Sequence, residues 1–337
     1  MKPTSAQISA LYHWYREHQR PLPWRKTKDA YSIWISETML QQTTTQVVIP
    51  YYERFLKELP ALKDLAEASQ EKVYALWAGL GYYSRARNLQ KAAKALHAVQ
   101  GFPRTAQALM EFPGFGPYTS RAVSSLAFEE QVGVLDGNVI RVLTRVHDLD
   151  VEWWKTAARR RLQELADQWV QGFPSSQMNQ ALMELGATIC TPTSPSCLLC
   201  PLKSSCRARK NDTLSLRPKS KPRPSKKRLL WTVRPLVKDG AIFLTMNHPY
   251  PILKSQLLPP GEMKTITDKP KTFDFKHTIT HHEIFVHVDS SSKKRKAEEG
   301  EWVRLKDLQR KSPSSLVRKV VSTLGAKENF PVFKSDF

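Results

Sequence analysis

Apolar residues recur at helical spacing over about the first 190 residues of the chain. Residues three or four apart share one face of an α-helix, so this spacing predicts helices with one buried face. Short segments containing Pro or Gly separate them, as is typical of helix ends and turns. The predicted helices cover residues 6–18, 31–49, 83–98, 105–111, 117–127, 138–148, 156–170 and 176–189.

The pattern changes towards the C-terminus, where β-branched and aromatic residues gather in short runs. Residues 229–238, 240–246 and 282–289 have this composition and predict strands. Residues 312–325 combine a Ser-rich start, helical apolar spacing and a closing Gly, and predict a helix. We therefore expect a helical N-terminal region followed by a small α+β domain at 229–337.

A basic segment separates these two regions. Residues 203–228 contain eleven Lys or Arg, three Pro and one acidic residue, Asp212. Such a segment cannot bury a core, so we expect an exposed, extended linker over 207–228, either a simple tether or a strap along a phosphate backbone. A second basic run at 293–296 predicts a solvated loop.

The chain of 337 residues has a formal net charge of +21. This excess favours a polyanionic partner, because Lys and Arg release the counterions condensed on phosphates. An anionic membrane surface is the alternative, but we find no apolar run long enough to span a bilayer. The first residues carry charges where a signal peptide needs an apolar stretch, so we expect an intracellular protein.

All four cysteines lie within a short segment of the sequence. Cys190, Cys197, Cys200 and Cys206 follow the spacing C-x6-C-x2-C-x5-C. A small secreted protein would use such a set for disulfides, whereas an intracellular chain of this size favours metal ligands. Four thiolates can surround one metal centre, and the donor set alone leaves zinc and iron–sulfur equally open.

Residues 112–119 (FPGFGPYT) connect two predicted helices. Gly114 and Gly116 permit a sharp turn and a close approach of the backbone to a partner. Pro117 suits the first turn of the second helix, whose amide groups can bind phosphate. An ordinary helix–helix turn has the same composition, so this segment alone does not establish DNA binding.

Two acidic residues occupy contrasting positions. Glu37 shares a predicted helix face with Ile33 and Leu40, and burial there would raise the pKa of its carboxyl and keep it protonated. Asp136 begins a predicted helix, where amide donors favour the ionised form. One protonated and one charged carboxyl is the pair that glycosidic bond hydrolysis requires. The alternatives are a Glu37 paired with Arg25 and an Asp136 that only caps its helix.

These features resemble the MutY family of the endonuclease III and helix-hairpin-helix DNA glycosylase superfamily. The resemblance covers nearly the whole chain and is close over residues 20–206. It rests on the cysteine spacing, the hairpin, and the segments SETMLQQT at 36–43 and LDGNVIRVLTR at 135–145. Phe112 stands where the family usually has Leu, a conservative departure at a packing position.

The resemblance implies a mainly α fold, a helix-hairpin-helix glycosylase with a [4Fe–4S] cluster loop, plus a C-terminal α+β Nudix-like domain. The four cysteines would hold one cluster, with a structural role. The expected parts are a glycosylase region at 1–206, made of a six-helix barrel at about 22–130 and an iron–sulfur part at about 1–21 and 131–206, then a basic linker at 207–228 and a Nudix-like domain at 229–337.

The same resemblance implies a hydrolase that removes adenine mispaired with 8-oxoguanine or guanine in double-stranded DNA, leaving an abasic site in base excision repair. Glu37 would protonate adenine, Asp136 would stabilise the cationic sugar, and Asn138 would orient the acid–water network. Tyr118 stands where endonuclease III-like members have the Lys that forms a Schiff base, so the strand should stay intact. We expect a cytoplasmic monomer associated with the bacterial nucleoid, with no membrane partner.

Further residues take their expected roles from the resemblance. The adenine pocket would include Trp24, Arg25 and Gln180. The residues expected to contact DNA are Gln41, Gln42, Tyr82, Gly114, Gly116, Phe275, Lys276 and His277. Tyr82 would stack beside the oxidised guanine, and Gln42 would fill the space left by the extruded base.

The C-terminal domain lacks the glutamate-rich helix that a Nudix hydrolase uses for its metal, so recognition of the lesion rather than hydrolysis is expected. Phe275, Lys276 and His277 resemble the family's Phe-Ser-His loop, which reads the damaged base. Lys276 replaces the expected Ser, which puts the hydrogen bond to the lesion in doubt, although Lys can reach a phosphate.

Two other functions stay open. A related glycosylase could act on another base, such as thymine opposite guanine, because Tyr118 permits this. A non-catalytic iron–sulfur DNA-binding protein would keep the cysteines and the hairpin but lose Glu37 or Asp136, and both acids are present.

Overall fold

The computed structural model describes residues 2–222, 225–246, 248, 250, 256–279, 281–290, 299–312 and 314–328. The chain divides into two compact units, Met1–Pro222 and Arg223–Phe337. The basic run expected as a loop at 293–296 lies outside the described residues.

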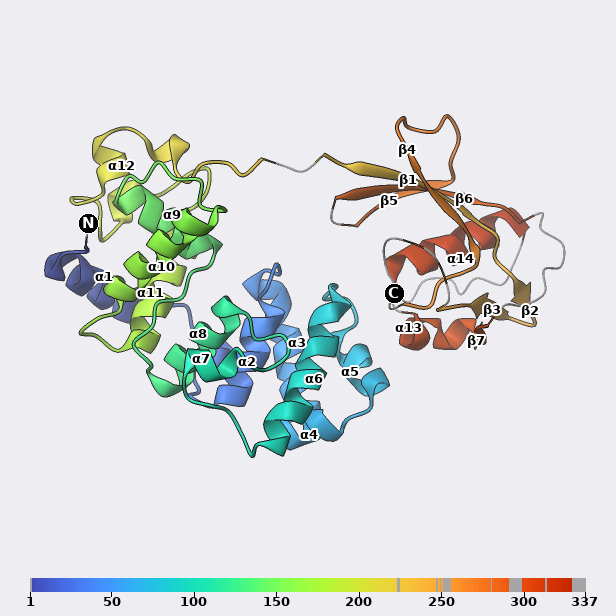
Figure 1. Ribbon diagram of the computed structural model, residues 1–337, viewed down its shortest axis with the longest axis horizontal. Helices are drawn as coiled ribbons and strands as arrows, with labels where there is room; N and C mark the ends of the chain where they lie inside the picture. The colour runs from blue at the N-terminus through green and yellow to red at the C-terminus, as the bar shows by residue number, and fades with distance from the viewer. Residues whose placement is uncertain are drawn as a thin grey trace. The chain divides into compact units, whose positions relative to one another are not determined.

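The first unit is helical (Figure 1). Most of the helices predicted up to residue 189 are confirmed close to their expected bounds. Its helices are α1 (Ser5–His18), η1 (Pro23–Arg25), α2 (Ala30–Met39), α3 (Thr45–Glu58), α4 (Leu62–Glu67), α5 (Gln70–Trp77), α6 (Tyr83–Ala98), α7 (Ala106–Leu109), α8 (Pro117–Phe128), α9 (Gly137–Val146), α10 (Thr156–Trp169), α11 (Ser175–Thr188), η2 (Cys197–Leu199), α12 (Arg207–Lys210) and η3 (Leu214–Leu216).

The single helix predicted over 31–49 is wrong, because the chain turns between α2 and α3. Gln42 has a φ of 60° in this turn, the left-handed conformation that interrupts a right-handed helix. Thr44 then precedes α3 in an extended conformation. Apolar residues continue at helical spacing on both sides of the turn, so periodicity alone did not reveal the break.

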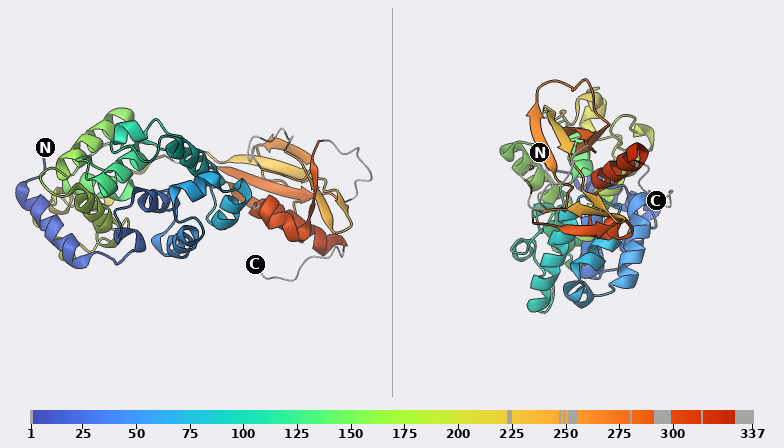
Figure 2. Two further views of the ribbon diagram at one scale, coloured as in Figure 1. Left: turned by 90° about the horizontal axis from the view of Figure 1, so that it is seen from below. Right: turned by 90° about the vertical axis from the view of Figure 1, so that its right-hand side faces the viewer.

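Two hydrophobic cores organise the first unit. The first core is built mainly from α2 to α8 and contains Trp34 and Trp77. The second is built mainly from α1 and α9 to α11 and contains Trp169. The chain enters the first core at Leu22 and leaves it at Val134. Figures 1 and 2 show the corresponding helices as two groups within this unit.

The expected extended linker is wrong in its first half. The short helix α12 and the turn η3 fold onto the first unit, and Ala208 is fully buried. Arg217 forms ion pairs with Asp148 and Asp150, each at 3.0 Å. Basic side chains that composition assigned to solvent therefore have carboxylate partners, and the two units divide only after Pro222.

The second unit contains two small sheets and a packed helix (Figures 1 and 2). One sheet has the order β4-β1-β6-β5, with β1 parallel to β6 and the other pairs antiparallel, and the other sheet has the order β2-β3-β7. Buried residues of α14 complete its core. The elements are β1 (Lys227–Val233), β2 (Val237–Lys238), β3 (Ala241–Leu244), β4 (Gly261–Ile266), β5 (Phe275–Ile279), β6 (His282–Val288), β7 (Glu301–Arg304), η4 (Leu305–Asp307), α13 (Leu308–Lys311) and α14 (Ser315–Glu328).

Strands β4, β5 and β7 were not predicted from sequence. They are only partly buried, with exposed polar residues at several positions, so they lack the apolar character on which the prediction relied. Helix α14 also continues beyond the Gly that was expected to end it.

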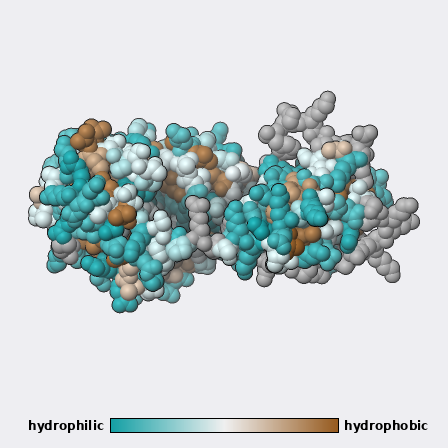
Figure 3. Space-filling model, turned by 90° about the horizontal axis from the view of Figure 1, so that it is seen from above, coloured by the Kyte–Doolittle hydropathy of each residue, from teal (hydrophilic) through white to brown (hydrophobic). Residues whose placement is uncertain are grey.

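Hydrophilic residues cover most of the visible surface of both units, and apolar residues form small separate patches (Figure 3). Among the helices that the structure describes, none combines the length and apolar character needed to cross a bilayer.

Candidate functional site

A cavity of about 840 Å³ opens where the two cores of the first unit meet. Its walls come from α1, η1, α2, α8, α11 and the starts of α3 and α9. The cavity brings together seven of the residues predicted from sequence, namely Trp24, Arg25, Glu37, Tyr118, Asp136, Asn138 and Gln180. Tertiary folding therefore joins both acids, the tyrosine and the proposed base-binding residues in one place.

Glu37 reaches this cavity from an almost entirely buried helix. Nine of the ten residues of α2 (Ala30–Met39), Glu37 included, are buried, and Glu37 is only 4% exposed. Burial raises the pKa of Glu37 to about 7, and the negative charge of Asp136 adds to this effect. A substantial protonated fraction therefore remains near neutral pH, as a general acid requires.

Tyr118 is the second residue of α8 and contacts this acid directly. Its hydroxyl donates a 2.6 Å hydrogen bond to Oε2 of Glu37. The bond opposes the effect of burial on the pKa of Glu37. Burial and the neighbouring carboxylates raise the pKa of Tyr118 well above its ordinary value, so the phenol keeps its proton and acts as the donor.

Asp136 caps α9 from its N-terminus. Its Oδ1 accepts a 2.7 Å hydrogen bond from the amide of Val139, and its Oδ2 accepts a 3.0 Å bond from Nδ2 of Asn138. Burial nevertheless raises the pKa of Asp136, while these donors and Arg141 lower it. The expectation that its environment favours only the ionised form was therefore incomplete, since burial opposes the cap.

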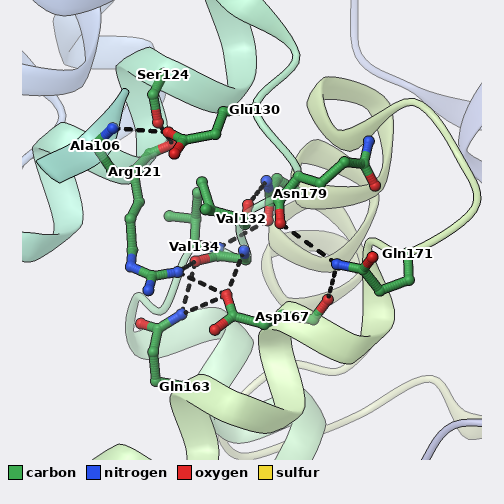
Figure 4. Close-up of polar contacts among 12 residues, drawn as sticks. Ala106, Arg121, Ser124, Glu130, Val132, Val134, Gln163, Asp167, Gln171 and Asn179 are labelled. Atoms are coloured by element: carbon green, nitrogen blue, oxygen red, sulfur yellow. Dashed lines mark hydrogen bonds and ion pairs between the residues drawn. The ribbon is translucent and has the colours of Figure 1, made fainter. Parts of the chain in front are cut away.

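The segment leading to Asp136 is held by a polar network between the two groups of helices (Figure 4). The Asp167 carboxylate accepts from the amide of Gly133 at 2.7 Å and from the Arg121 guanidinium at 2.6 Å. Asn179 accepts from the amide of Val134 at 2.8 Å. A Cβ at Gly133 would lie 2.3 Å from the backbone of α10, so only Gly fits this close crossing. These contacts fix the position from which Asp136 enters the cavity.

Asn138 is in turn held by Arg141, which sequence reasoning did not single out. The Arg141 guanidinium donates to Oδ1 of Asn138 at 2.8 Å and to the carbonyls of Gly186 and Cys190 at 2.7 Å each. The Asp136 side chain is thus connected through two residues to the backbone of the first cysteine.

Arg25 does not pair with Glu37, which removes that alternative. Its Nη2 donates to Oε2 of Glu184 at 2.7 Å, and Arg20 also donates to Glu184, at 2.7 Å through Nε. Although burial opposes it, hydrogen bonds from Arg20 and Arg25 lower the pKa of Glu184 to about 2. Sequence reasoning missed Glu184, although it follows Gln180 by four residues and so lies on the same helix face.

The other two residues predicted for the adenine pocket, Trp24 and Gln180, line the cavity but have different contacts. Trp24 is 8% exposed and belongs to the first core, where its ring contacts Tyr52 edge-on, so part of its surface serves packing. Gln180 accepts a 3.0 Å hydrogen bond from the hydroxyl of Tyr15. Tyr15 also lines the cavity and is a further residue that the sequence did not indicate.

The predicted hairpin connects α7 to α8, with Pro117 as the first residue of the second helix. Gly114 has a φ of +82° and needs the freedom of Gly, and its Cβ would also approach Asn88 to 3.0 Å. Gly116 has a φ of −82° and open space around it, so the turn itself does not require Gly at this position. At Gly116 the missing side chain instead leaves the helix N-terminus accessible.

Gln41, Gln42 and Tyr82 lie in two loops outside the cavity lining. Gln41 donates to the hydroxyl of Thr119 at 3.2 Å, and Gln42 is exposed in the turn after α2. Tyr82 is 49% exposed and has a φ of 49° at the residue before α6. An exposed aromatic ring on a left-handed residue is available for a partner, and it does not serve core packing.

The four cysteines line one small, mainly apolar cavity behind α9 and α11. None of the four forms a disulfide. The buried Arg145 donates to Sγ of Cys190 at 3.5 Å and to the carbonyl of Thr191 at 2.7 Å. Burial and the neighbouring thiols raise the pKa of Cys200 to about 12, so thiolates need a cationic centre among them.

This donor set fits a sulfur-ligated group. Within the described part of the chain, no three His, Cys, Asp or Glu side chains are arranged to hold a single metal ion. The sulfurs instead surround a common space, with no carboxylate or imidazole among its lining residues.

The residues predicted to read the lesion lie in the second unit. Phe275, Lys276 and His277 are on strand β5, so the expected loop is wrong. Phe275 packs against the core of this unit, and burial lowers the pKa of His277. Lys276 points to the opposite face, as alternation along a strand requires, and pairs with Glu283 at 3.6 Å.

Comparison with known proteins agrees with this architecture. Residues 35–168 match the family described as HhH-GPD superfamily base excision DNA repair protein. The adenine DNA glycosylase of Rattus norvegicus is 47% identical over 209 residues, which cover 59% of this chain and 40% of the relative. That of Buchnera aphidicola subsp. Schizaphis graminum (strain Sg) is 35% identical over 249 residues, or 73% of this chain and 67% of the relative. The chain therefore spans only about 40% of the length of its mammalian relative.

Solved structures show the same helical fold. A thermostable thymine-DNA glycosylase superposes with a TM-score of 0.56 at 28% identity, covering 60% of this chain and 95% of that protein. A non-covalent endonuclease III–DNA complex has a TM-score of 0.51 at 22% identity, covering 62% and 99%. Both matches cover little more than half of the chain, which agrees with its two-unit organisation.

Proposed function

The chain belongs to the MutY family of helix-hairpin-helix DNA glycosylases, and we propose on this basis that it hydrolyses the N-glycosidic bond of adenine in double-stranded DNA. The observation that carries the proposal is the buried Glu37, bonded to Tyr118 and electrostatically coupled to Asp136. The sequence identity of this chain to adenine DNA glycosylases supports adenine as the base that it removes.

The reaction follows from the protonation states in the cavity. Protonated Glu37 donates its proton to a ring nitrogen of the flipped adenine, which makes the base a neutral leaving group as the bond to C1′ breaks. The carboxylate of Asp136 stabilises the cationic sugar that remains. Water then adds to C1′ and loses its proton to a carboxylate, which leaves an abasic site and free adenine.

The strand should remain intact after this reaction. A strand-cleaving glycosylase needs an amine that attacks C1′. Of the residues that line the cavity, Lys28 has an amine, but its Nζ is bonded to Glu129 at 2.6 Å and to Ser176 at 2.9 Å. Tyr118 stands next to the acid and cannot form a Schiff base.

The preferred mispair in this proposal is adenine opposite 8-oxoguanine or guanine. The exposed ring of Tyr82 supports a stacking role on the opposite strand, and the large positive charge supports binding of a duplex. The second unit would contribute to lesion recognition through Lys276 rather than through a Ser. The protein would act as a cytoplasmic monomer on nucleoid DNA.

The cysteines would hold one [4Fe–4S] cluster in this proposal. Cys190, Cys197, Cys200 and Cys206 would ligate the four irons, and the cluster would brace the loop that follows α11. Iron and acid-labile sulfide in equal amounts in the purified protein would support this assignment. Zinc as the bound metal would overturn it.

One assay tests the activity. The purified protein is incubated with duplexes that place adenine opposite 8-oxoguanine, adenine opposite guanine, or thymine opposite guanine, and products are analysed with and without hot alkali. We expect breaks only after alkali and only in the adenine duplexes. Release of thymine instead would identify the related mismatch glycosylase, and duplex binding without release of any base would identify a non-catalytic DNA-binding protein.

A further inference from the structure

Arg85, on α6, makes contacts that the proposed reaction does not use. Its guanidinium Nη1 donates to the backbone carbonyls of Thr38 and Met39 at 3.0 Å each and of Gln41 at 2.5 Å. Its Nη2 donates to the carbonyls of Leu80 at 3.2 Å and Gly81 at 3.4 Å. One side chain therefore binds the end of α2 and the loop before α6 together.

Helix α2 carries the proposed acid, Glu37, and is followed by Gln42, which is expected to fill the space left by the extruded base. Thr38 and Met39 immediately follow Glu37, and their carbonyls belong to the last turn of α2, where intrahelical partners run out. The positive guanidinium also complements the negative end of the helix dipole there. Gln41, whose carbonyl accepts the shortest of the bonds, begins the turn that exposes Gln42.

The second element carries the exposed aromatic ring. The Arg85 guanidinium carbon lies 5.4 Å from the ring centroid of Tyr82 and 5.5 Å from that of Trp77. Trp77 in turn donates to the carbonyl of Gly81 at 3.1 Å, which adds a second contact to the same loop. The guanidinium thus lies near two aromatic rings while its Nη1 and Nη2 groups donate to carbonyls on both elements, a combination that Lys cannot reproduce.

We propose that Arg85 is a positioning residue that fixes Tyr82 relative to the Gln41–Gln42 turn, so that the two loops enter the duplex together and deliver the base to Glu37. No carboxylate pairs with Arg85 in the contacts described, and the guanidinium is surrounded instead by carbonyls from the end of α2, from Gln41 and from the loop before α6. This inference rests on the proposed function, because it assigns Tyr82 and Gln42 to insertion into DNA.

The test compares Arg85→Lys with Arg54→Lys. Arg54 is a matched control because it stacks on Tyr51 at 4.8 Å and donates to one backbone carbonyl, that of Leu76, at 3.1 Å. It contacts neither the Gln41–Gln42 turn nor Tyr82 in the described contacts. Single-turnover rates of adenine release are measured and normalised to the active fraction from burst amplitudes, so that unfolded protein does not contribute.

For Arg85→Lys we expect a rate at least about tenfold lower, which corresponds to about 1.36 kcal/mol in the barrier. The fluorescence change that reports unstacking of 2-aminopurine placed at the adenine position should fall in parallel. Arg54→Lys should leave both signals close to those of the wild type. Equal effects of the two substitutions would overturn the proposal.

A double-mutant cycle with Tyr82→Ala tests the coupling itself. If Arg85 acts through Tyr82, the double variant should be no slower than the slower single variant. Fully additive losses would show that Arg85 has an independent, merely structural role. Absence of adenine release by the wild-type protein would instead refute the proposed function, which separates the two possible failures.

Discussion

The hydroxyl of Tyr118 donates a 2.6 Å hydrogen bond to Oε2 of Glu37, although the two residues are 81 positions apart in the chain. This bond stabilises the carboxylate, whereas burial stabilises the protonated acid. Burial has the larger effect and leaves the pKa of Glu37 at about 7. The acid is therefore available near neutral pH and remains oriented by the phenol.

Glu37→Gln should abolish adenine release while duplex binding survives. The amide is similar in size but has no proton of suitable acidity, so we expect a loss of roughly 10²- to 10⁴-fold in the single-turnover rate. Gel-shift measurements on the mispaired duplex check binding. Glu17→Gln is a suitable control because Glu17 is an exposed residue of α1. Turnover unchanged by Glu37→Gln would remove the proposed acid.

The rate of base release should fall as pH rises through about 7, because only the protonated form of Glu37 donates a proton. The pKa of this group is raised on folding from 4.5, so the folded state binds the extra proton between about pH 4.5 and 7. Its contribution to stability is complete below pH 4.5 and is lost as pH rises through about 7. Glu37→Gln should therefore raise the melting temperature relative to wild type more at pH 8 than at pH 5.

Tyr118→Phe should move the descending limb of the pH–rate profile to higher pH. Removal of the hydroxyl eliminates the bond that lowers the pKa of Glu37, so burial acts unopposed by that donor. Tyr31→Phe provides the control, since Tyr31 is another buried tyrosine whose hydroxyl donates to the carbonyl of Leu59 at 2.8 Å. A shift to lower pH in Tyr118→Phe would contradict the assigned role of the hydroxyl.

Asp136→Asn should distinguish the role of Asp136 as the N-cap of α9 from the role of its negative charge in the reaction. Asn caps helices about as well as Asp, so the melting temperature should change little. The neutral side chain cannot stabilise a cationic sugar, and the rate should fall by at least about tenfold, equivalent to about 1.36 kcal/mol. Asp29→Asn is the matched control, because Asp29 caps α2 through the amide of Ser32 at 2.8 Å. Comparable rates for the two variants would mean that Asp136 is only a cap.

Much of the architecture could be predicted because it depends on local periodicity. Helices such as α6 were predicted at their observed bounds, since their apolar residues repeat at 3.6 residues per turn. The break at Gln42 could not be predicted, because it needs a left-handed backbone conformation at a position where the sequence has no Gly. The partly buried strands β4 and β5 gave too little apolar contrast to be recognised.

By itself, the sequence determined the candidate chemistry: a carboxyl on an apolar helix face at Glu37, a helix-capping carboxylate at Asp136, and four clustered thiols. These features follow from residue types and their spacing, which can be read without knowledge of the fold. Tertiary structure alone decided that Tyr118 bonds to Glu37, that Arg25 pairs with Glu184 instead, and that Arg85 joins two loops. Such partners come from distant segments, and only packing of the two cores sets which donor lies within hydrogen-bonding distance of which acceptor.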